Sequence, residues 1–311
     1  MLNDEQLKNE GLRKDKFQRK TKETDIELYL NIDGNGEYTI DTGIPFFDHM
    51  LEQLAKHSNF DVELHAKGDT EVDLHHLIED TGIVIGHAIN KLAGEKKGIK
   101  RYGFASVPMD EALVQTTVDF SGRAYFVYHY YCNNDNNDYN KSACGNYNVK
   151  NKIAQLSIFN NSGFNDLSNG FNIFNRRSTE KLLNKFVNKQ NRTDVGAKNL
   201  AQKTNSINNH DSIDSMQSAK SINNSKESKT GLFDLELVYN ELVAEIFFYD
   251  YVNIFFEALC KNALINLHIN IMYGCNYHHI TEAVFKACAV SISDALSKTG
   301  RNNILSTKGI I

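Results

Sequence analysis

The chain has 311 residues, of which 41% are hydrophobic and 23% are charged, and its net charge is −5. These values are typical of a globular protein with a packed core. The five cysteines form no Cys-x-x-Cys pair, which argues against a disulfide scaffold and a cysteine zinc ribbon. The polar N-terminus is unlike a secretory signal, and no apolar run approaches the ~18 residues of a membrane span. We therefore expect a cytoplasmic protein without a membrane partner.

Residues 132–230 differ sharply in composition from the rest of the chain. This segment contains 23 Asn, 14 Lys or Arg and 8 Asp or Glu, so its balance is +6 while the remainder of the chain carries −11. It has too little apolar surface to offset the entropy of ordering it. We expect an Asn-rich, disordered insertion that loops out of the fold. Its basic balance alone is weak evidence for nucleic-acid binding, and we expect no nucleic-acid partner.

Outside this segment the chain repeats itself. Each copy opens a helical pattern with a Phe pair, continues into an alternating strand and ends on a second helix that begins with His-His-x-x-Glu. Asp73 and Asn276, two residues before the paired histidines, are candidate N-caps. In chain order, the predicted strands are Ile26–Asn31, Glu37–Asp41, Asp61–Ala66, Phe104–Val107, Leu113–Phe120, Ala124–Tyr131 and Leu264–Ile271.

This order predicts an α+β fold of two duplicated half-domains, each a small, mostly antiparallel sheet with helices on one face. Neither half could bury its apolar helix faces well alone, so the two halves should pack together. The first half-domain is expected at residues 19–94, after an N-terminal extension at 1–18. The second is expected at residues 95–131 plus 231–311, on either side of the insertion.

The paired histidines are the strongest chemical feature. Residues four apart share a helix face, so His75 with Glu79, and His278 with Glu282, can each grip one metal ion. The neighbouring histidine of each pair is rotated by about 100° and should serve another ion. Two copies predict a reciprocal arrangement with two ions, and imidazole and carboxylate donors suit Mn, Fe or Zn. The histidines outside the pairs that are plausible further ligands are His49 and His268. His65 matches His268 in the repeat, since each lies ten residues before a His-His pair, and it is a weaker candidate.

Several basic residues outside the insertion suggest an anionic ligand. Ser306 and Lys308 lie in a Ser-Thr-Lys-Gly sequence that offers a hydroxyl, an ammonium and a flexible backbone for a phosphate. Lys286 is four residues beyond Glu282, so a helical salt bridge is an equally simple interpretation of that lysine. The remaining candidates are Arg101 and Arg123.

Several collinear blocks together resemble the imidazoleglycerol-phosphate dehydratase family. They include DTGIPFFDHMLEQLAKH (41–57), DLHHLIEDTGIVIGHAI (73–89), PMDEALVQTTVDFSGRAYF (108–126) and GCNYHHITEAVFKA (274–287). The resemblance implies a hydro-lyase of histidine biosynthesis that dehydrates imidazole glycerol phosphate to imidazole acetol phosphate. It also implies the ribosomal protein S5 domain 2-like fold, two manganese ions per site, and a homo-oligomer of 24 subunits with sites at subunit interfaces.

The resemblance also assigns residues. One ion should take His49, His76, His278 and Glu282, the other should take His75, Glu79, His268 and His279, and His65 should bind neither. Glu23 matches the candidate base. The residues that match the family's substrate and phosphate site are Gln53, Arg101, Arg123, Lys286, Ser306 and Lys308.

Two other functions fit part of the pattern. A dinuclear metallohydrolase acting on a phosphate ester would explain the metal ligands and the basic residues, but not the collinear blocks. Metal storage in a helical shell would need four long helices with Glu-x-x-His motifs, which the strand-rich spacing disfavours.

Overall fold

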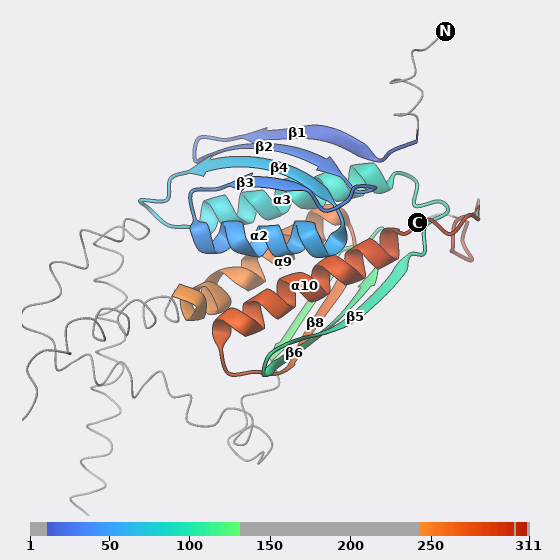
Figure 1. Cartoon of the computed structure of the whole chain (residues 1–311). Helices are drawn as coiled ribbons and strands as arrows, with labels where there is room; N and C mark the ends of the chain where they lie inside the picture. The colour runs from blue at the N-terminus through green and yellow to red at the C-terminus, as the bar shows by residue number, and fades with distance from the viewer. Residues whose placement is uncertain (1–10, 131–242, 302, 310–311) are drawn as a thin grey trace, which may run out of the picture. The chain divides into compact units, whose positions relative to one another are not determined.

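The computed structural model describes residues 11–130, 243–301 and 303–309, all of which belong to one compact unit. Two four-stranded sheets enclose two layers of helices (Figure 1). The predicted insertion at 132–230 lies outside the described residues. Within the described part, no helix combines the length and apolarity that a membrane crossing requires.

The first sheet has the strand order β1-β2-β4-β3. Its strands β1 and β2, and β2 and β4, are antiparallel, whereas β3 runs parallel to β4 because helix α2 crosses between them. Helix α3 follows β4. The bounds are β1 Lys14–Lys20, β2 Thr24–Asn31, β3 Tyr38–Asp41, α2 Pro45–Ser58, β4 Asp61–Gly68 and α3 His75–Ala93.

The second sheet repeats this topology with the order β5-β6-β8-β7, and again the last pair, β7 and β8, is the parallel one. The predicted fold class, two duplicated half-domains with mostly antiparallel sheets, is therefore confirmed. The bounds are β5 Tyr102–Met109, β6 Ala112–Asp119, β7 Tyr125–Tyr130, a π-helical turn η3 Phe248–Val252, α9 Asn253–Ala263, β8 Asn266–Tyr273 and α10 Tyr277–Leu296.

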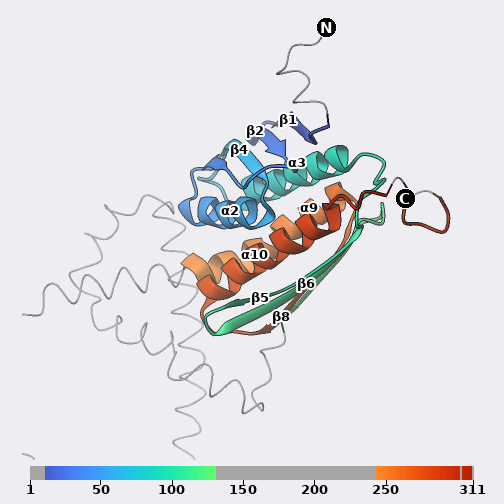
Figure 2. The ribbon, with the colours of Figure 1, turned by 45° about the vertical axis from the view of Figure 1, so that its right-hand side comes forward.

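The helices of the two halves pack on each other in the middle of the molecule. Helix α3 packs against α9, and α2 packs against α10 (Figures 1 and 2). Phe47, Phe255 and Phe285 are fully buried in this layer. The α3–α9 contact is close because Gly86 has no side chain, and a Cβ there would lie 2.4 Å from the carbonyl oxygen of Leu259. Each half thus covers the apolar helix faces of the other.

Strand β1 was not predicted, and it includes residues that the sequence analysis assigned to an N-terminal extension. Its sequence KDKFQRK contains one large apolar residue, Phe17, and none of its residues is fully buried. The strand lies at the edge of its sheet, and it is held there by backbone pairing with β2 rather than by burial of its side chains. An apolar pattern is therefore too weak to reveal such a strand.

The structure also corrects the alignment of the two copies. The strands β4 and β8 each begin two residues after a left-handed helix C-cap, Asn59 or Leu264, so His268 matches Glu63 rather than His65. Both histidines lie ten residues before a His-His pair because the connection from strand to helix is longer in the first half.

The two helix starts also differ in their capping. Asn276 caps α10 as predicted, because its side chain accepts the backbone N–H groups of His278 and His279. Asp73 is not the N-cap of α3, which is Leu74, although its carboxylate accepts the N–H of His75 at 3.2 Å.

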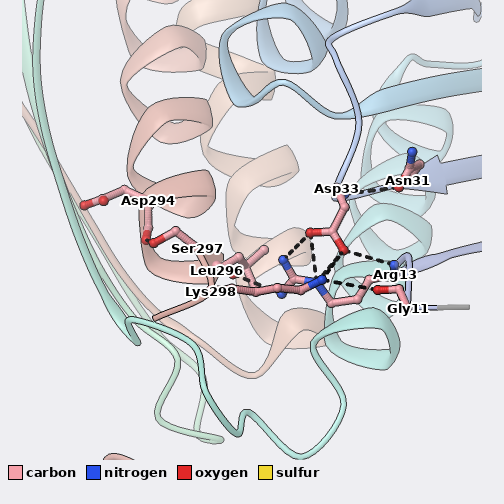
Figure 3. Close-up of polar contacts among 8 residues, drawn as sticks. All are labelled: Gly11, Arg13, Asn31, Asp33, Asp294, Leu296, Ser297 and Lys298. Carbon is pink, nitrogen blue, oxygen red and sulfur yellow. Dashed lines mark hydrogen bonds and ion pairs between the residues drawn. The ribbon is translucent and has the colours of Figure 1, made fainter. Parts of the chain in front are cut away.

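A polar cluster fastens the start of the first half to the end of the second (Figure 3). Arg13 donates from its Nε and Nη2 to Asp33, and from its Nη1 to the carbonyl oxygen of Leu296 at 2.9 Å, where α10 ends. Lys298 donates to the same Asp33 carboxylate at 3.1 Å. Burial by itself raises the pKa of Asp33, but the hydrogen bonds from Arg13 and Lys298 outweigh it and lower the pKa to about 2.

We expect Asp33→Asn to lower the free energy of unfolding at pH 7 by about 1–2 kcal/mol. Because the folded pKa is depressed below the ordinary 3.8, this stabilisation is present above about pH 4 and is lost as pH falls toward about 2. Urea unfolding at pH 7, 4 and 2.5 measures it. The matched control is Asp15→Asn. Asp15 forms an exposed ion pair with Lys91, so this substitution should change the free energy of unfolding less. A difference between Asp33→Asn and wild type that does not shrink with falling pH would contradict the assignment.

Candidate metal centre and substrate site

The packing of α2 on α10 brings three metal-ligating side chains together. Among the described residues, His49, His278 and Glu282 are the one group of three His, Cys, Asp or Glu side chains with ligand atoms within 4.8 Å of one another. The Oε2 atom of Glu282 lies 3.3 Å from Nε2 of His278 and 3.7 Å from Nε2 of His49. The first histidine comes from the first half of the chain and the other two residues from the second half.

The environment of this group favours the protonation states that bind a metal ion. Burial lowers the pKa of His278, which favours the neutral imidazole. Burial raises the pKa of Glu282, but the hydrogen bond and charge of Lys286, 2.6 Å from Glu282 Oε1, together with the nearby His49 and His278, outweigh burial and lower this pKa. The carboxylate therefore stays ionised, with one oxygen toward the histidines and the other on the lysine. A neutral imidazole and an ionised carboxylate are what metal binding requires.

The other predicted metal ligands lie apart from this group within the chain. His75 Nε2 lies 3.4 Å from Glu79 Oε2, and both side chains are nearly half exposed, so they form an open pair. His268 lies on β8 with its ring 6.2 Å from that of Tyr125 on the neighbouring strand. The predicted i, i+4 pairing of His with Glu is present on both helices, whereas the four-residue ligand sets are not brought together within one chain.

The second histidine of each pair is held by a carboxylate that the sequence analysis did not single out. His76 Nδ1 lies 3.2 Å from both oxygens of Asp69, whose hydrogen bond raises the pKa of this histidine. His279 Nδ1 lies 2.7 Å from Glu111 Oε2. In both cases a carboxylate holds Nδ1, so Nε2 is the nitrogen that could bind a metal ion, which is the arrangement commonly seen behind metal-binding histidines. Nε2 of His279 lies 3.6 Å from Oδ2 of Asp110, beyond hydrogen-bonding distance.

Glu23 lies close to the first of these contacts. It occupies the turn between β1 and β2, its side chain is 55% exposed, and its Oε2 is 3.8 Å from His76 Nδ1. The backbone of the turn is well fixed, because Thr21 Oγ1 accepts the N–H of Glu23 at 3.1 Å and the N–H of Asp69 donates to the carbonyl of Glu23 at 3.1 Å. The predicted base is therefore beside a predicted metal ligand.

The predicted phosphate-binding residues fall into two regions. Arg101 makes a two-pronged contact with Asp119, at 2.7 and 3.2 Å, and donates to the carbonyl oxygen of Leu305. It therefore holds the chain directly before Ser306, whose Oγ accepts the N–H of the exposed Lys308 at 3.2 Å. Three hydrogen bonds at the turn after β6 tie Arg123 to Ser121.

Lys286 and Gln53 lie near the metal-ligating group instead. Lys286 forms the helical salt bridge to Glu282 that its spacing allowed. Gln53 is half-buried on α2, one turn beyond His49.

A duplicated α+β fold that brings histidines and a carboxylate together from both halves defines a candidate metalloenzyme. The family model described as imidazoleglycerol-phosphate dehydratase matches residues 42–162 and 228–292, leaving out 163–227 within the predicted insertion. The chain belongs to the imidazoleglycerol-phosphate dehydratase family. This membership confirms the predicted family and the enzyme class, a hydro-lyase.

Two of the three curated relatives described below match nearly the whole chain, and the third matches a shorter part at higher identity. The imidazoleglycerol-phosphate dehydratase of Thermodesulfovibrio yellowstonii is 35% identical over 300 residues, which cover 96% of this chain and 100% of the relative. That of Acetivibrio thermocellus is 35% identical over 300 residues, with coverages of 96% and 99%. That of Caldicellulosiruptor bescii is 58% identical over 118 residues, which cover 38% of this chain and 61% of the relative.

Two crystal structures of the family are also similar to this chain. The imidazoleglycerol-phosphate dehydratase of Staphylococcus aureus subsp. aureus N315 has a TM-score of 0.48 at 22% identity and covers 91% of this chain and 98% of that chain. The structure from Pyrococcus furiosus, in complex with (S)-C348, has a TM-score of 0.49 at 20% identity, with coverages of 95% and 100%.

We expect His278→Ala to weaken binding of a divalent ion, tested with Mn²⁺ as the probe, by about 10-fold or more, because removing a ligand should cost no less than removing the partner that orients one. Calorimetric titration of the metal-free protein with Mn²⁺ measures the affinity, and elemental analysis after desalting measures the metal retained. The control is His65→Ala, which removes an exposed histidine from β4. Equal metal affinity in the two variants would show that the group around Glu282 does not bind the ion.

Proposed function

We propose that this protein removes water from imidazole glycerol phosphate to give imidazole acetol phosphate, as a step of histidine biosynthesis in the cytoplasm. The family membership supports the reaction. The observation that carries the proposal is the convergence of His49, His278 and Glu282 from two half-domains on one point. Such a mixed nitrogen and oxygen donor set suits a divalent transition metal.

The site is proposed to bind two Mn²⁺ ions. Two ligand atoms that are each about 2.1 Å from one ion lie at most about 4.2 Å apart, and the distances of 3.3 and 3.7 Å around Glu282 meet this limit. In keeping with the family resemblance, one ion would take His49, His76, His278 and Glu282, and the other would take His75, Glu79, His268 and His279.

The grouping of these donors supports sites that are shared between subunits. Within the chain His49 lies with His278 and Glu282, while His75 lies with Glu79 in an open, half-exposed pair. For His76 to bind the same ion as His49, His278 and Glu282, it would therefore have to come from a second chain. We propose a homo-oligomer, with 24 subunits as the resemblance implies, in which each site combines helix α3 of one chain with α2 and α10 of another.

A bound ion would supply Lewis-acid polarisation and a template for the imidazole of the substrate. The chain itself supplies the base: the Glu23 carboxylate takes the carbon-bound proton, and the C–O bond of the hydroxyl group breaks. The departing hydroxide takes that proton from the protonated Glu23 and leaves as water, so the base returns to its carboxylate form. The fixed backbone of its turn and its exposed side chain suit this role, since the carboxylate can reach a ligand without reorganising the strands.

The basic residues are proposed to hold the phosphate. Arg101 positions the Ser306–Lys308 loop through Leu305, so a guanidinium, a hydroxyl and an ammonium come from neighbouring parts of the fold. Lys286 adds a positive charge beside the metal ligands. The full set of proposed substrate contacts is Gln53, Arg101, Arg123, Lys286, Ser306 and Lys308.

Incubating the Mn²⁺-loaded protein with imidazole glycerol phosphate tests the reaction, with the acetol product followed by mass spectrometry. We expect Glu23→Gln to lower kcat by at least about 100-fold, because the variant lacks the base, and to retain Mn²⁺ at the wild-type ratio. Glu71→Gln, which changes an exposed residue near α3, is the matched control. Release of inorganic phosphate by wild type in place of the acetol product would favour a metallohydrolase. Loss of metal in Glu23→Gln would contradict the role of base.

A further inference from the structure

The two β-hairpins that open the half-domains are equivalent. Lys20 pairs with Asp25 in the first, and Pro108 pairs with Leu113 in the second, so each pair encloses a segment of four residues. The third residue of that segment is a glutamate in both halves, Glu23 and Glu111. The proposed base therefore has a structural counterpart in the second half, which the sequence repeat did not reveal.

The counterpart has a different task. Glu111 Oε2 lies 2.7 Å from Nδ1 of His279, and its Oε1 accepts the backbone N–H of Asn276 at 2.8 Å and of Cys275 at 3.3 Å. Its side chain is 24% exposed. Both of its oxygens are thus engaged in fixing the start of α10 and the imidazole of His279, and this carboxylate is not free to act on a substrate.

In the first half, another residue holds the corresponding imidazole. His76 Nδ1 lies 3.2 Å from both Asp69 oxygens, whereas Glu23 Oε2 is 3.8 Å away, beyond hydrogen-bonding distance. The backbone N–H of Asp69 also holds the carbonyl of Glu23. Asp69 therefore fixes the position of the turn through its backbone and occupies His76 through its side chain.

The second half has no room for an equivalent of Asp69. Strands β4 and β8 are both eight residues long, and the residue that follows each is Asp69 or Gly274. A Cβ at Gly274 would lie 2.6 Å from Cγ1 of Ile280 and 2.9 Å from Cβ of Ala112. A side chain is therefore sterically excluded at that position, and the orienting carboxylate comes from the hairpin.

We propose that Asp69 is a positioning residue that orients the histidine in the first half, as the hairpin glutamate Glu111 does in the second. This proposal rests on the metal-dependent dehydration proposed above. Asp69 holds the imidazole of His76 so that Nε2 faces the metal ion, and it thereby leaves the Glu23 carboxylate free to reach the substrate. The two halves have the same parts, but the carboxylate that orients the histidine comes from the hairpin in one and from the end of the strand in the other.

A double-mutant cycle on Mn²⁺ affinity tests this exchange of roles. We expect Asp69→Ala to weaken Mn²⁺ binding about 10-fold or more, and Asp69→Asn, which keeps an acceptor oxygen, to weaken it less. Glu23→Gln alone should leave the affinity unchanged. In the Asp69→Ala background, however, Glu23 becomes the nearest carboxylate to His76, and Glu23→Gln should then weaken binding further. Glu71→Ala removes the same charge from the connection that contains Asp69 and is the control.

Glu111→Gln completes the comparison, since it should weaken Mn²⁺ binding as Asp69→Ala does. Circular dichroism and thermal melting of each variant show that a lost affinity is not lost folding. An unchanged Mn²⁺ affinity in folded Asp69→Ala, or an additive effect of Glu23→Gln in both backgrounds, would overturn the proposal. Because the readout is metal binding, this outcome is distinct from failure of the dehydration, in which wild type binds Mn²⁺ but forms no acetol product.

Discussion

The contact between helices α2 and α10 is the interaction on which the candidate site depends. His49 reaches His278 and Glu282 because these two helices, from different half-domains, are pressed together between the sheets. The burial of apolar side chains such as Phe47, Phe255 and Phe285 supplies the driving force for this packing. A rigid, close-packed interior then keeps the ligand atoms at fixed distances.

Duplication explains how one chain acquires two similar but unequal halves. Both sheets have the same strand order, both second helices carry His-His-x-x-Glu, and a carboxylate lies against Nδ1 of the second histidine in each half. The sources of that carboxylate differ, because a glycine stands where the first half has Asp69. One of the two equivalent hairpin glutamates, Glu111, is held by hydrogen bonds at the start of α10. The other, Glu23, has an exposed carboxylate beside His76, which is proposed as a metal ligand.

The sequence predicted those features that depend on local spacing. The i, i+4 pairing of His278 with Glu282 and the alternation in most strands are local, and both are present. Strand β1 was missed because an edge strand needs little apolar surface. The match of His65 with His268 was wrong because two connections differ in length. The orienting role of Asp69 was missed because it depends on the register of the hairpins and on the space around Gly274. Neither can be derived from the sequence without the three-dimensional structure.

The central claim is that each metal site is shared between chains, with His75 and His76 from one chain and His49, His278 and Glu282 from another. Co-expressing two differently tagged variants tests it most directly: His75→Ala with His76→Ala on one chain, and His49→Ala with His278→Ala on the other. Each variant alone should be inactive. Random co-assembly should restore about a quarter of the wild-type activity, since about one site in four pairs two intact contributions. Mixed assemblies no more active than their parents would contradict the shared site.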